Sequence, residues 1–182
     1  MEQGADVNDI DPEVAAALGF PKLKYAWVER ERRWLCAAIP EDLVTKVEEI
    51  TDLYVEGTRL RLREAIPQDG GPAMRRLGRK ADVDATTRLL TSIYLQPEEF
   101  ALLAGLPGVR LTKTRHHLRA PAGVTMSIDR FHGLLEGLIL AEAEFDDPEA
   151  LKAFPMPDFA LREVTDDPCY GGAHLARHGL PA

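Results

Sequence analysis

The chain contains several segments in which apolar and charged residues alternate, the spacing expected of a β-strand with two different faces. In Thr58–Glu64 three arginines alternate with two leucines, so that the arginines lie on one face. Lys24–Ala38, Met74–Val83 and Val109–Arg119 likewise place charged residues on one face. We predict that each of these segments is a strand with a charged face.

Four more strands are predicted from runs rich in β-branched and apolar residues, at Ile50–Val55, Thr86–Leu95, Val124–Phe131 and Leu138–Phe145. Proline and capping signals predict helices after Asp11 and at Pro97–Leu106, Pro148–Phe154 and Tyr170–Gly179, with a helical turn at Pro40–Val44. Most of the strands are joined by short turns. This order favours a mainly β fold, an eight-stranded antiparallel sheet closed into a barrel with a few peripheral helices, over a parallel α/β fold.

Composition limits the number of domains, the class of partner and the cellular location that we expect. With 45% hydrophobic residues the chain can form one domain with a sizeable core, and its net charge of -8 argues against a nucleic-acid partner. No apolar run approaches the roughly 18 residues of a membrane span, and Met1–Asp11 is too polar and acidic for a signal peptide. Cys36 and Cys169 lack metal or redox spacing, so we expect free thiols, a cytoplasmic location and no membrane partner. The oligomeric state stays open, with a homodimer as one option.

The charged faces have two interpretations. Taken singly, each is typical of an exposed edge strand with mixed charges. Facing inward together, they would line a barrel that is stable only if water, a metal ion and a polyanion share the space, because unpaired buried charge is costly. Arginine suits phosphate oxygens and paired glutamates suit Mg²⁺ or Mn²⁺, so this interpretation predicts a polyphosphate ligand bound with a divalent ion. The positions are Glu29, Glu31, Arg33, Arg59, Arg61, Arg63, Arg76, Lys80, Lys113, Arg115, Asp129, Glu142 and Glu144.

Short motifs along the chain resemble those of a known superfamily. Val28–Arg33 is similar to the E-x-E-x-K signature near the N-terminus of the CYTH, or triphosphate tunnel metalloenzyme, superfamily. Matching segments follow in the family's order: Arg59–Arg63 resembles its R-x-R strand, Lys80 its next lysine, Lys113–Arg115 its K-x-R strand, Ile128–Phe131 its acidic strand, and Ala141–Phe145 its closing E-x-E strand. The resemblance covers residues 24–176. Members include inorganic triphosphatases, thiamine triphosphatases and class IV adenylyl cyclases.

The resemblance implies an eight-stranded antiparallel tunnel that binds a triphosphate end-on, with residues 23–182 as the tunnel domain and residues 1–22 as an N-terminal extension. The implied metal ligands, for Mg²⁺ or Mn²⁺, are Glu29, Glu31, Glu142 and Glu144. The implied substrate-binding residues are Arg59, Arg61, Arg63, Lys80, Arg88, Lys113 and Arg115. Glu31, Arg33 and Asp129 are the implied catalytic residues, with Asp129 as a metal ligand or a water-orienting group. An oriented water would attack the terminal phosphate while the cations neutralise the developing charge.

Two positions depart from the family pattern. Arg33 stands where the family has lysine, and its guanidinium keeps the charge but cannot transfer a proton. Arg88 is followed by Leu90 and Ser92, whereas the family's fifth strand often reads R-x-E-x-E, so two acidic residues are absent. Their absence would remove a second metal site or the water-activating carboxylate.

The leading hypothesis is a metal-dependent phosphohydrolase acting on inorganic triphosphate or a small organic triphosphate. A non-catalytic triphosphate- or polyphosphate-binding protein is the alternative that the residues at positions 90 and 92 favour. A class IV-type adenylyl cyclase is a further alternative, although the sequence identifies no adenine pocket.

A few residues outside the motifs also carry expectations. Trp27 shares the face of Glu29, and it either borders the tunnel opening or packs against neighbouring residues. His116 and His117 lie on opposite faces of one strand, so at most one of them faces inward. Glu48 and Glu49 are predicted to be solvated turn residues.

Overall fold

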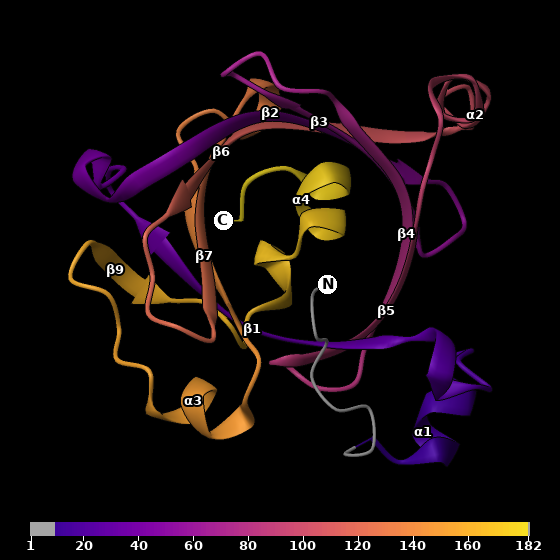
Figure 1. The fold of residues 1–182 in the computed structure, drawn as a ribbon, viewed down its shortest axis with the longest axis horizontal. Helices are drawn as coiled ribbons and strands as arrows, with labels where there is room; N and C mark the ends of the chain where they lie inside the picture. The colour runs from indigo at the N-terminus through magenta and orange to yellow at the C-terminus, as the bar shows by residue number, and fades with distance from the viewer. Residues whose placement is uncertain (1–9, 182) are drawn as a thin grey trace.

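The computed structural model describes residues 10–181, which form one antiparallel sheet closed into a barrel (Figure 1). The strands are β1 (Trp27–Cys36), β2 (Val44–Val55), β3 (Leu60–Pro67), β4 (Met74–Asp82), β5 (Thr87–Tyr94), β6 (Gly108–Leu118), β7 (Val124–Phe131), β8 (Ile139–Phe145) and β9 (Ala160–Glu163). Their order is β5-β4-β3-β2-β6-β7-β8-β1-β9, and the additional pairing of β5 with β1 closes the ring. β9 lies outside the eight-stranded ring, and the predicted fold class is confirmed.

β1 is the strand at which the ring closes. Its first half, Trp27 to Arg30, pairs with β5, whereas its second half, Glu31 to Leu35, pairs with β8. β9 then pairs with the end of β1 from Trp34 onward. Every one of these pairings is antiparallel, and successive side chains along a strand point alternately into and out of the barrel, apart from a register shift between Leu35 and Cys36 where β1 meets β9.

The helices are short and lie at the periphery. They are α1 (Pro12–Ala17), α2 (Pro97–Leu103), α3 (Pro148–Ala153) and α4 (Gly172–His178), with single 3₁₀ turns η2 (Leu23–Tyr25), η3 (Glu41–Leu43), η4 (Gly133–Leu135) and η5 (Pro168–Tyr170). The Asp11 side chain caps α1 by accepting from the Glu13 amide at 2.7 Å, as the N-cap signal predicts. Within residues 10–181 no helix is long and apolar enough to cross a membrane.

Two apolar clusters cover the outside of the barrel. Beneath α3, Leu151 packs in a cluster with Trp34 and Ile128, both fully buried. Beneath α1, Ala15 packs in a cluster with Val28 and Leu89. Figure 1 shows α1 and α3 outside the ring of strands. The outward strand faces therefore supply much of the apolar burial, which leaves the inward faces available for polar side chains.

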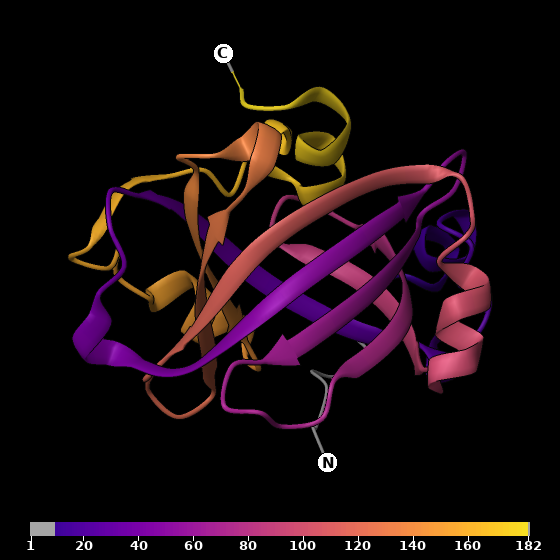
Figure 2. The same ribbon diagram turned by 90° about the horizontal axis from the view of Figure 1, so that it is seen from above.

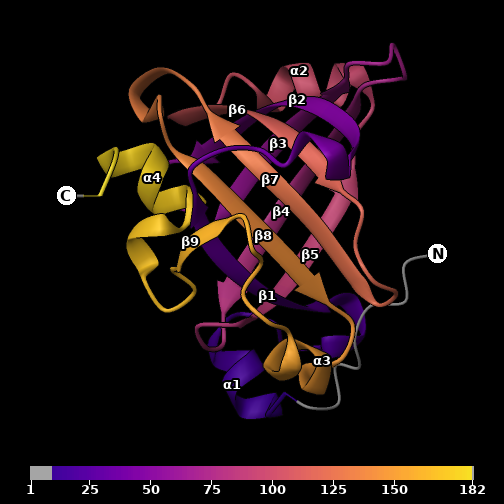
Figure 3. The same ribbon diagram turned by 90° about the vertical axis from the view of Figure 1, so that its left-hand side faces the viewer.

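A third apolar cluster closes one end of the barrel. Leu175 of α4 is 1% exposed and packs in a cluster with Leu111 and Leu140. α4 appears within the outline of the ring in Figure 1, and Figures 2 and 3 show from the side that it lies at one end of the barrel. The C-terminal segment thus covers one end of the interior with apolar side chains.

Two expectations about elements were wrong, and one set lies outside the described residues. β2 begins at Val44 rather than Ile50. Glu48 therefore lies within the strand, faces inward and is 5% exposed, instead of lying in a solvated turn. β9, which lies between the predicted helices at Pro148–Phe154 and Tyr170–Gly179, was not among the predicted strands. The expectations for Met1–Asp11 concern residues that, apart from Ile10 and Asp11, are outside the described chain.

Candidate active site inside the barrel

The charged faces of the strands point into the barrel. The clearest sign is that ion pairs join strands that are not neighbours in the sheet. Lys80 of β4 bonds Glu29 of β1 across β5, and Arg115 of β6 bonds Glu142 of β8 across β7 at 2.6 Å. Side chains can meet in this way only over the inner face of the strand between them. The expectation that cations and acids from separate strands converge is met for these residues.

On one side of the interior, two arginines of β3 share an aspartate of β2. Asp52 is fully buried and accepts two hydrogen bonds of 2.7 Å from Arg63, while Arg61 Nε lies 3.7 Å from its Oδ1. Burial alone would raise the pKa of Asp52, but the charges of Arg63 and Arg61 outweigh burial and hold that pKa below its ordinary value. Asp52 therefore stays ionised and fixes the direction of both guanidinium groups.

A second aspartate organises the cations of β6. Asp129 of β7 is 1% exposed, accepts from Arg115 at 2.6 and 2.7 Å, and also bonds Lys113. Burial opposes its ionisation, yet Arg115 and Lys113 lower the pKa of Asp129. Burial and the neighbouring Arg115 lower the pKa of Lys113. Arg115 thus bridges Asp129 to Glu142 and connects the cations to the acids of β8.

The acids of β1 and β8 form a crowded group. In register Glu31 lies opposite Glu144, and Arg33 lies opposite Glu142. Burial and then the charge of Glu29 raise the pKa of Glu144 to about 7, while burial and then Glu142 raise the pKa of Glu31. Burial also opposes the ionisation of Glu29 and Glu142, yet Lys80 lowers the pKa of Glu29 and Arg115 lowers that of Glu142. The cations therefore compensate two of the four acids, while burial and repulsion leave Glu31 and Glu144 easier to protonate.

Most of these acids already contact a cation. Glu29 bonds Lys80, and Glu31 lies 2.5 Å from Arg88 and 3.2 Å from Arg33. Among residues 10–181 no three carboxylate, imidazole or thiol groups are arranged to hold a metal ion. Binding a cation at the predicted ligands would therefore require the glutamate side chains to turn from their present partners.

Arg76 belongs to the interior, as its strand face predicts, although it is not among the substrate-binding residues that the family resemblance implies. It lies in register with Arg63 on the inner face of β4, and within the described chain no carboxylate forms an ion pair with it. Burial, followed by the charges of Arg63 and Arg61, lowers the pKa of Arg76 to about 10. The signal was present in the sequence, because Arg76 and Lys80 alternate on the same face.

Arg59 and Arg33 differ from the other predicted cations. Arg59 precedes β3, is exposed, and donates to the carbonyl oxygen of Leu18 at 3.1 Å, so the structure does not bring it to the interior cluster. Arg33 lies in the interior beside Glu31, and its Nη2 reaches the carbonyl oxygen of Thr165 at 3.5 Å. Arg33 therefore links the acid group to the C-terminal segment.

Two further interior residues were not predicted as part of the site. Asp52 and Glu48 both lie on the inner face of β2, and Glu48 bonds Lys46 at 2.5 Å and His117 at 2.8 Å. His117 is therefore the inward histidine of its pair, and His116 is buried on the opposite face. The spacing of Glu48 and Asp52, with an isoleucine midway, is the strand period that could have revealed them.

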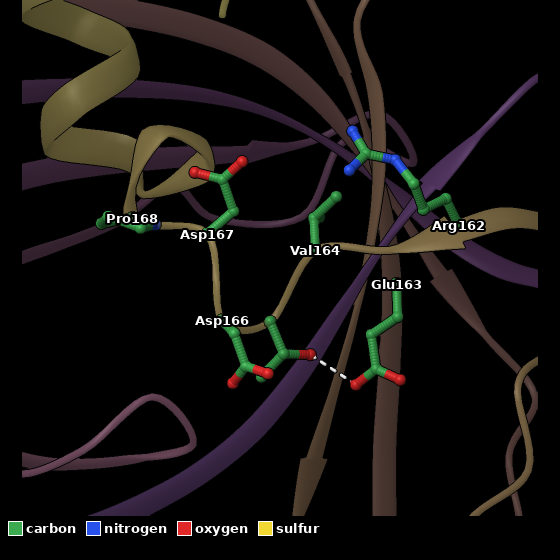
Figure 4. A pocket seen from close by; sticks show the side chains of 7 residues that line it. Arg162, Glu163, Val164, Asp166, Asp167 and Pro168 are labelled. Atoms are coloured by element: carbon green, nitrogen blue, oxygen red, sulfur yellow. Dashed lines mark hydrogen bonds between the residues drawn. The ribbon is translucent and has the colours of Figure 1, made fainter.

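A surface pocket lies along the C-terminal segment, which contacts the interior where Arg33 meets Thr165. Its lining is the segment from Arg162 to Pro168, and Figure 4 shows Glu163, Asp166 and Asp167 around it. None of the predicted site residues lines this pocket. We therefore place the candidate site inside the barrel, where the charges converge.

No protein-family model matches the chain, but two curated proteins do. An inorganic triphosphatase of Nitrosomonas europaea is 35% identical over 85 residues, 46% of this chain and 56% of the relative. An inorganic triphosphatase of Acetivibrio thermocellus is 43% identical over 56 residues, 31% of this chain and 35% of the relative. The match thus spans about half of the first relative and about a third of the second.

Solved structures extend the similarity to most of the chain. The inorganic triphosphatase NE1496 has a TM-score of 0.55 at 27% identity, covering 81% of this chain and 93% of that one. The PH1819 protein from Pyrococcus horikoshii has a TM-score of 0.54 at 22% identity, covering 68% of this chain and 82% of that one, and shows the fold alone.

Proposed function

We propose that the protein, whose motifs resemble those of the CYTH, or triphosphate tunnel metalloenzyme, superfamily and which is similar to two inorganic triphosphatases, hydrolyses inorganic triphosphate or a small organic triphosphate with the help of a divalent metal ion. The observation that carries the proposal is the separation of charge inside the barrel. Arg76 lies in register with Arg63, and burial together with the neighbouring arginines lowers its pKa, while Glu144 lies in register with Glu31, and burial together with the neighbouring acids raises its pKa. A polyanion bound beside Arg76 and a metal cation bound beside Glu144 would offset both costs.

The cationic side would bind the phosphates. Arginine forks donate two parallel hydrogen bonds to phosphate oxygens, and Asp52 and Asp129 already hold the forks of Arg63 and Arg115 in fixed directions. Such preorganisation lowers the entropy lost when a phosphate chain binds. The proposed phosphate-binding residues are Arg61, Arg63, Arg76, Lys80, Arg88, Lys113 and Arg115.

The acidic side would bind the metal ion. Glu29, Glu31, Glu142 and Glu144 supply the carboxylate oxygens that Mg²⁺ and Mn²⁺ prefer. Burial and then repulsion between these acids raise the pKa of Glu31 and Glu144, and a bound cation would offset both effects. When bound, the ion supplies Lewis-acid polarisation of the terminal phosphoryl group. Phosphates entering among Lys80, Arg88 and Arg115 would also compete with Glu29, Glu31 and Glu142 for these cations, which frees the glutamates.

The chain's own residues would support hydrolysis mainly through charge. The water oxygen bonds to the terminal phosphorus, the bond from that phosphorus to the bridging oxygen breaks, and pyrophosphate leaves with the electron pair when the substrate is inorganic triphosphate. The proton lost by water passes to a base or to solvent. Asp129 is a weak proton acceptor because its pKa is lowered, so its role would be to orient Lys113 and Arg115. Arg33 stays charged and would neutralise charge near Glu31.

The test is a panel of triphosphates with Mg²⁺ or Mn²⁺, in which released phosphate and pyrophosphate are both measured. Wild type is expected to release phosphate from inorganic triphosphate, and Glu31→Gln and Glu144→Gln are each expected to lower kcat at least a hundredfold, because each removes a proposed metal ligand. Glu149→Gln, an exposed glutamate of α3, serves as the matched control with wild-type turnover. Unchanged turnover in both site variants would refute the proposal.

The same panel decides between the alternatives. Leu90 and Ser92 occupy positions where acids are common in the superfamily, which is the observation that favours a protein that binds triphosphate without cleaving it. Tight binding of triphosphate with no released product under either metal would establish that alternative. Pyrophosphate released from ATP without phosphate would indicate a cyclase.

A further inference from the structure

One wall of the barrel interior carries no charge. Leu90 and Ser92 of β5 and Gly78 of β4 all lie on the inward face, since Leu90 pairs with Lys80 and Ser92 pairs with Gly78. On the other side of β5, Leu90 pairs with Trp27 at the start of β1. The residues Trp27, Leu90, Ser92 and Gly78 are called the neutral wall below.

The neutral wall borders the proposed phosphate-binding residues directly. In the order of pairing, Trp27, Leu90 and Lys80 lie side by side on three adjacent strands, and Lys80 bonds Glu29, two residues from Trp27. A neighbouring strand is about 4.8 Å away, so the indole lies about 10 Å from the position of Lys80. This separation is comparable to the distance between the base and the phosphate chain of a nucleoside triphosphate.

Trp27 is available to a ligand. It is 52% exposed, in contrast to Trp34, which is 0% exposed, and it belongs to none of the buried clusters within residues 10–181. Gly78 is buried, and a methyl group at its position would meet Leu90 Cδ1 and the Arg61 carbonyl oxygen at 3.9 Å, an ordinary van der Waals contact, so the glycine adds no side chain in front of Leu90. An exposed indole beside a leucine is a surface for a flat apolar group.

Inorganic triphosphate has no group that would use this surface, because every part of it is charged or strongly polar. We propose that the neutral wall binds the aromatic ring of an organic triphosphate, with the ring stacked on Trp27 and against Leu90 while the phosphates occupy the cationic side. This inference rests on the proposed function, since the same phosphate site holds the rest of the ligand. Stacking on an aromatic side chain tolerates different rings, so both purine and pyrimidine nucleoside triphosphates should bind.

The kinetic test compares three ligands that share the phosphate chain: ATP, ribose 5-triphosphate and inorganic triphosphate. The measured quantity is the ratio of kcat/KM for ATP to that for inorganic triphosphate. Trp27→Ala is expected to lower this ratio about tenfold, whereas Trp27→Phe should keep most of the wild-type ratio. The corresponding ratio of kcat/KM for ribose 5-triphosphate to that for inorganic triphosphate should change little in either variant. Ile93→Ala, which removes an exposed apolar side chain from the other face of β5, should keep the wild-type ratio.

If Trp27→Ala leaves the ATP ratio unchanged while inorganic triphosphate is still hydrolysed, the ring site is refuted and the proposed function stands. If no ligand is hydrolysed, the proposed function fails, and the ring site is then tested by measuring ligand binding. ATP should quench the emission of exposed Trp27 in EDTA, whereas ribose 5-triphosphate should not, and Trp27→Phe should abolish the quenching because Trp34 is fully buried. Equal effects of ATP and ribose 5-triphosphate would overturn the inference.

Discussion

Asp52 shows how a single buried carboxylate orients the cations inside the barrel. Its carboxylate is fully buried between two arginines of β3, and both of these guanidinium groups depend on it for their direction. A buried ion pair adds little net stability compared with apolar packing, but breaking one half of it is costly. Asp52 is therefore a positioning residue whose loss would leave two cations side by side.

Asp52→Asn is expected to destabilise the protein by about 3 kcal/mol near neutral pH, because it leaves buried cations without their counter-charge. The folded-state pKa of Asp52 lies below its ordinary value of 3.8, so its stabilising contribution is present above that pH and is lost as the pH falls further. Urea unfolding over a pH series should show a shallower acid loss of stability in the variant. Asp146→Asn, at an exposed site, should retain the wild-type acid loss.

For Arg76 we expect the opposite effect of substitution on stability, because the neighbouring arginines repel its charge. Arg76→Gln should leave the melting temperature of the ligand-free protein unchanged or raised, since the burial and neighbouring arginines that lower its pKa also disfavour its charge in the folded state. It should weaken triphosphate binding about tenfold, the loss expected for one charged hydrogen bond.

Calorimetric titration and thermal unfolding of the same preparations measure both effects of Arg76→Gln. Arg75→Gln is the matched control, because Arg75 lies next in sequence but on the outer face, where it bonds Glu64 at 2.7 Å. A fall in ligand-free stability together with unchanged affinity for triphosphate would contradict the role given to Arg76.

At the scale of elements, α4 shows that a short helix can be held in place entirely by packing. With seven residues it is too short to be stable alone in water, and its single fully buried side chain among described residues, Leu175, contacts the apolar end of the barrel. The position of α4 is therefore decided by the cluster around Leu111 and Leu140 and not by helix propensity.

Leu175→Ala is expected to lower the free energy of unfolding by about 3 kcal/mol, the usual cost of a large-to-small change at a fully buried site. Leu134→Ala, at a leucine that is 92% exposed, should change it by less than about 0.5 kcal/mol. Chemical denaturation of the two variants and wild type gives the comparison, and equal stability of all three would show that α4 does not close the barrel.

At the scale of the whole molecule, the barrel separates apolar burial from charge. Apolar clusters cover the outside and one end, while ionised side chains from all eight strands of the ring meet inside. Without a ligand, burial and neighbouring like charges disfavour the ionised forms of Arg76 and Glu144, which lowers the pKa of Arg76 and raises that of Glu144. Ligands whose charges offset these costs should stabilise the entire fold.

Inorganic triphosphate is expected to raise the melting temperature even in EDTA, because the excess of cations around Arg76 does not depend on a metal. At a hundredfold excess over Kd the stabilisation is about 2.7 kcal/mol. Adding Mg²⁺ or Mn²⁺ with a non-hydrolysable triphosphate analogue should raise it further. Differential scanning calorimetry measures these shifts, and sulfate at equal ionic strength controls for general salt effects; no shift beyond that control would contradict the charge separation.

Much of the fold and part of the site could be read from local patterns. The eight strands of the ring, β1 to β8, and the short helices follow from alternation, turns and caps, although β2 began earlier than predicted and β9 was missed. Four residues of β9 surrounded by prolines carry too weak a local signal, because that strand forms only by pairing with the end of β1. Glu48 was misjudged because a charged residue near a strand end resembles a turn residue until its partner, His117, is known.

The sequence by itself determined which residue types share each strand face, since that depends only on the period of two. Only the tertiary structure decided which of them meet. Closure of the ring places Asp52 and Arg76 among the interior arginines. Arg59 lies before the start of β3 and contacts Leu18, so it does not reach the interior. The physical reason is that a side chain's charge is local, whereas the field it experiences comes from strands far away in the sequence.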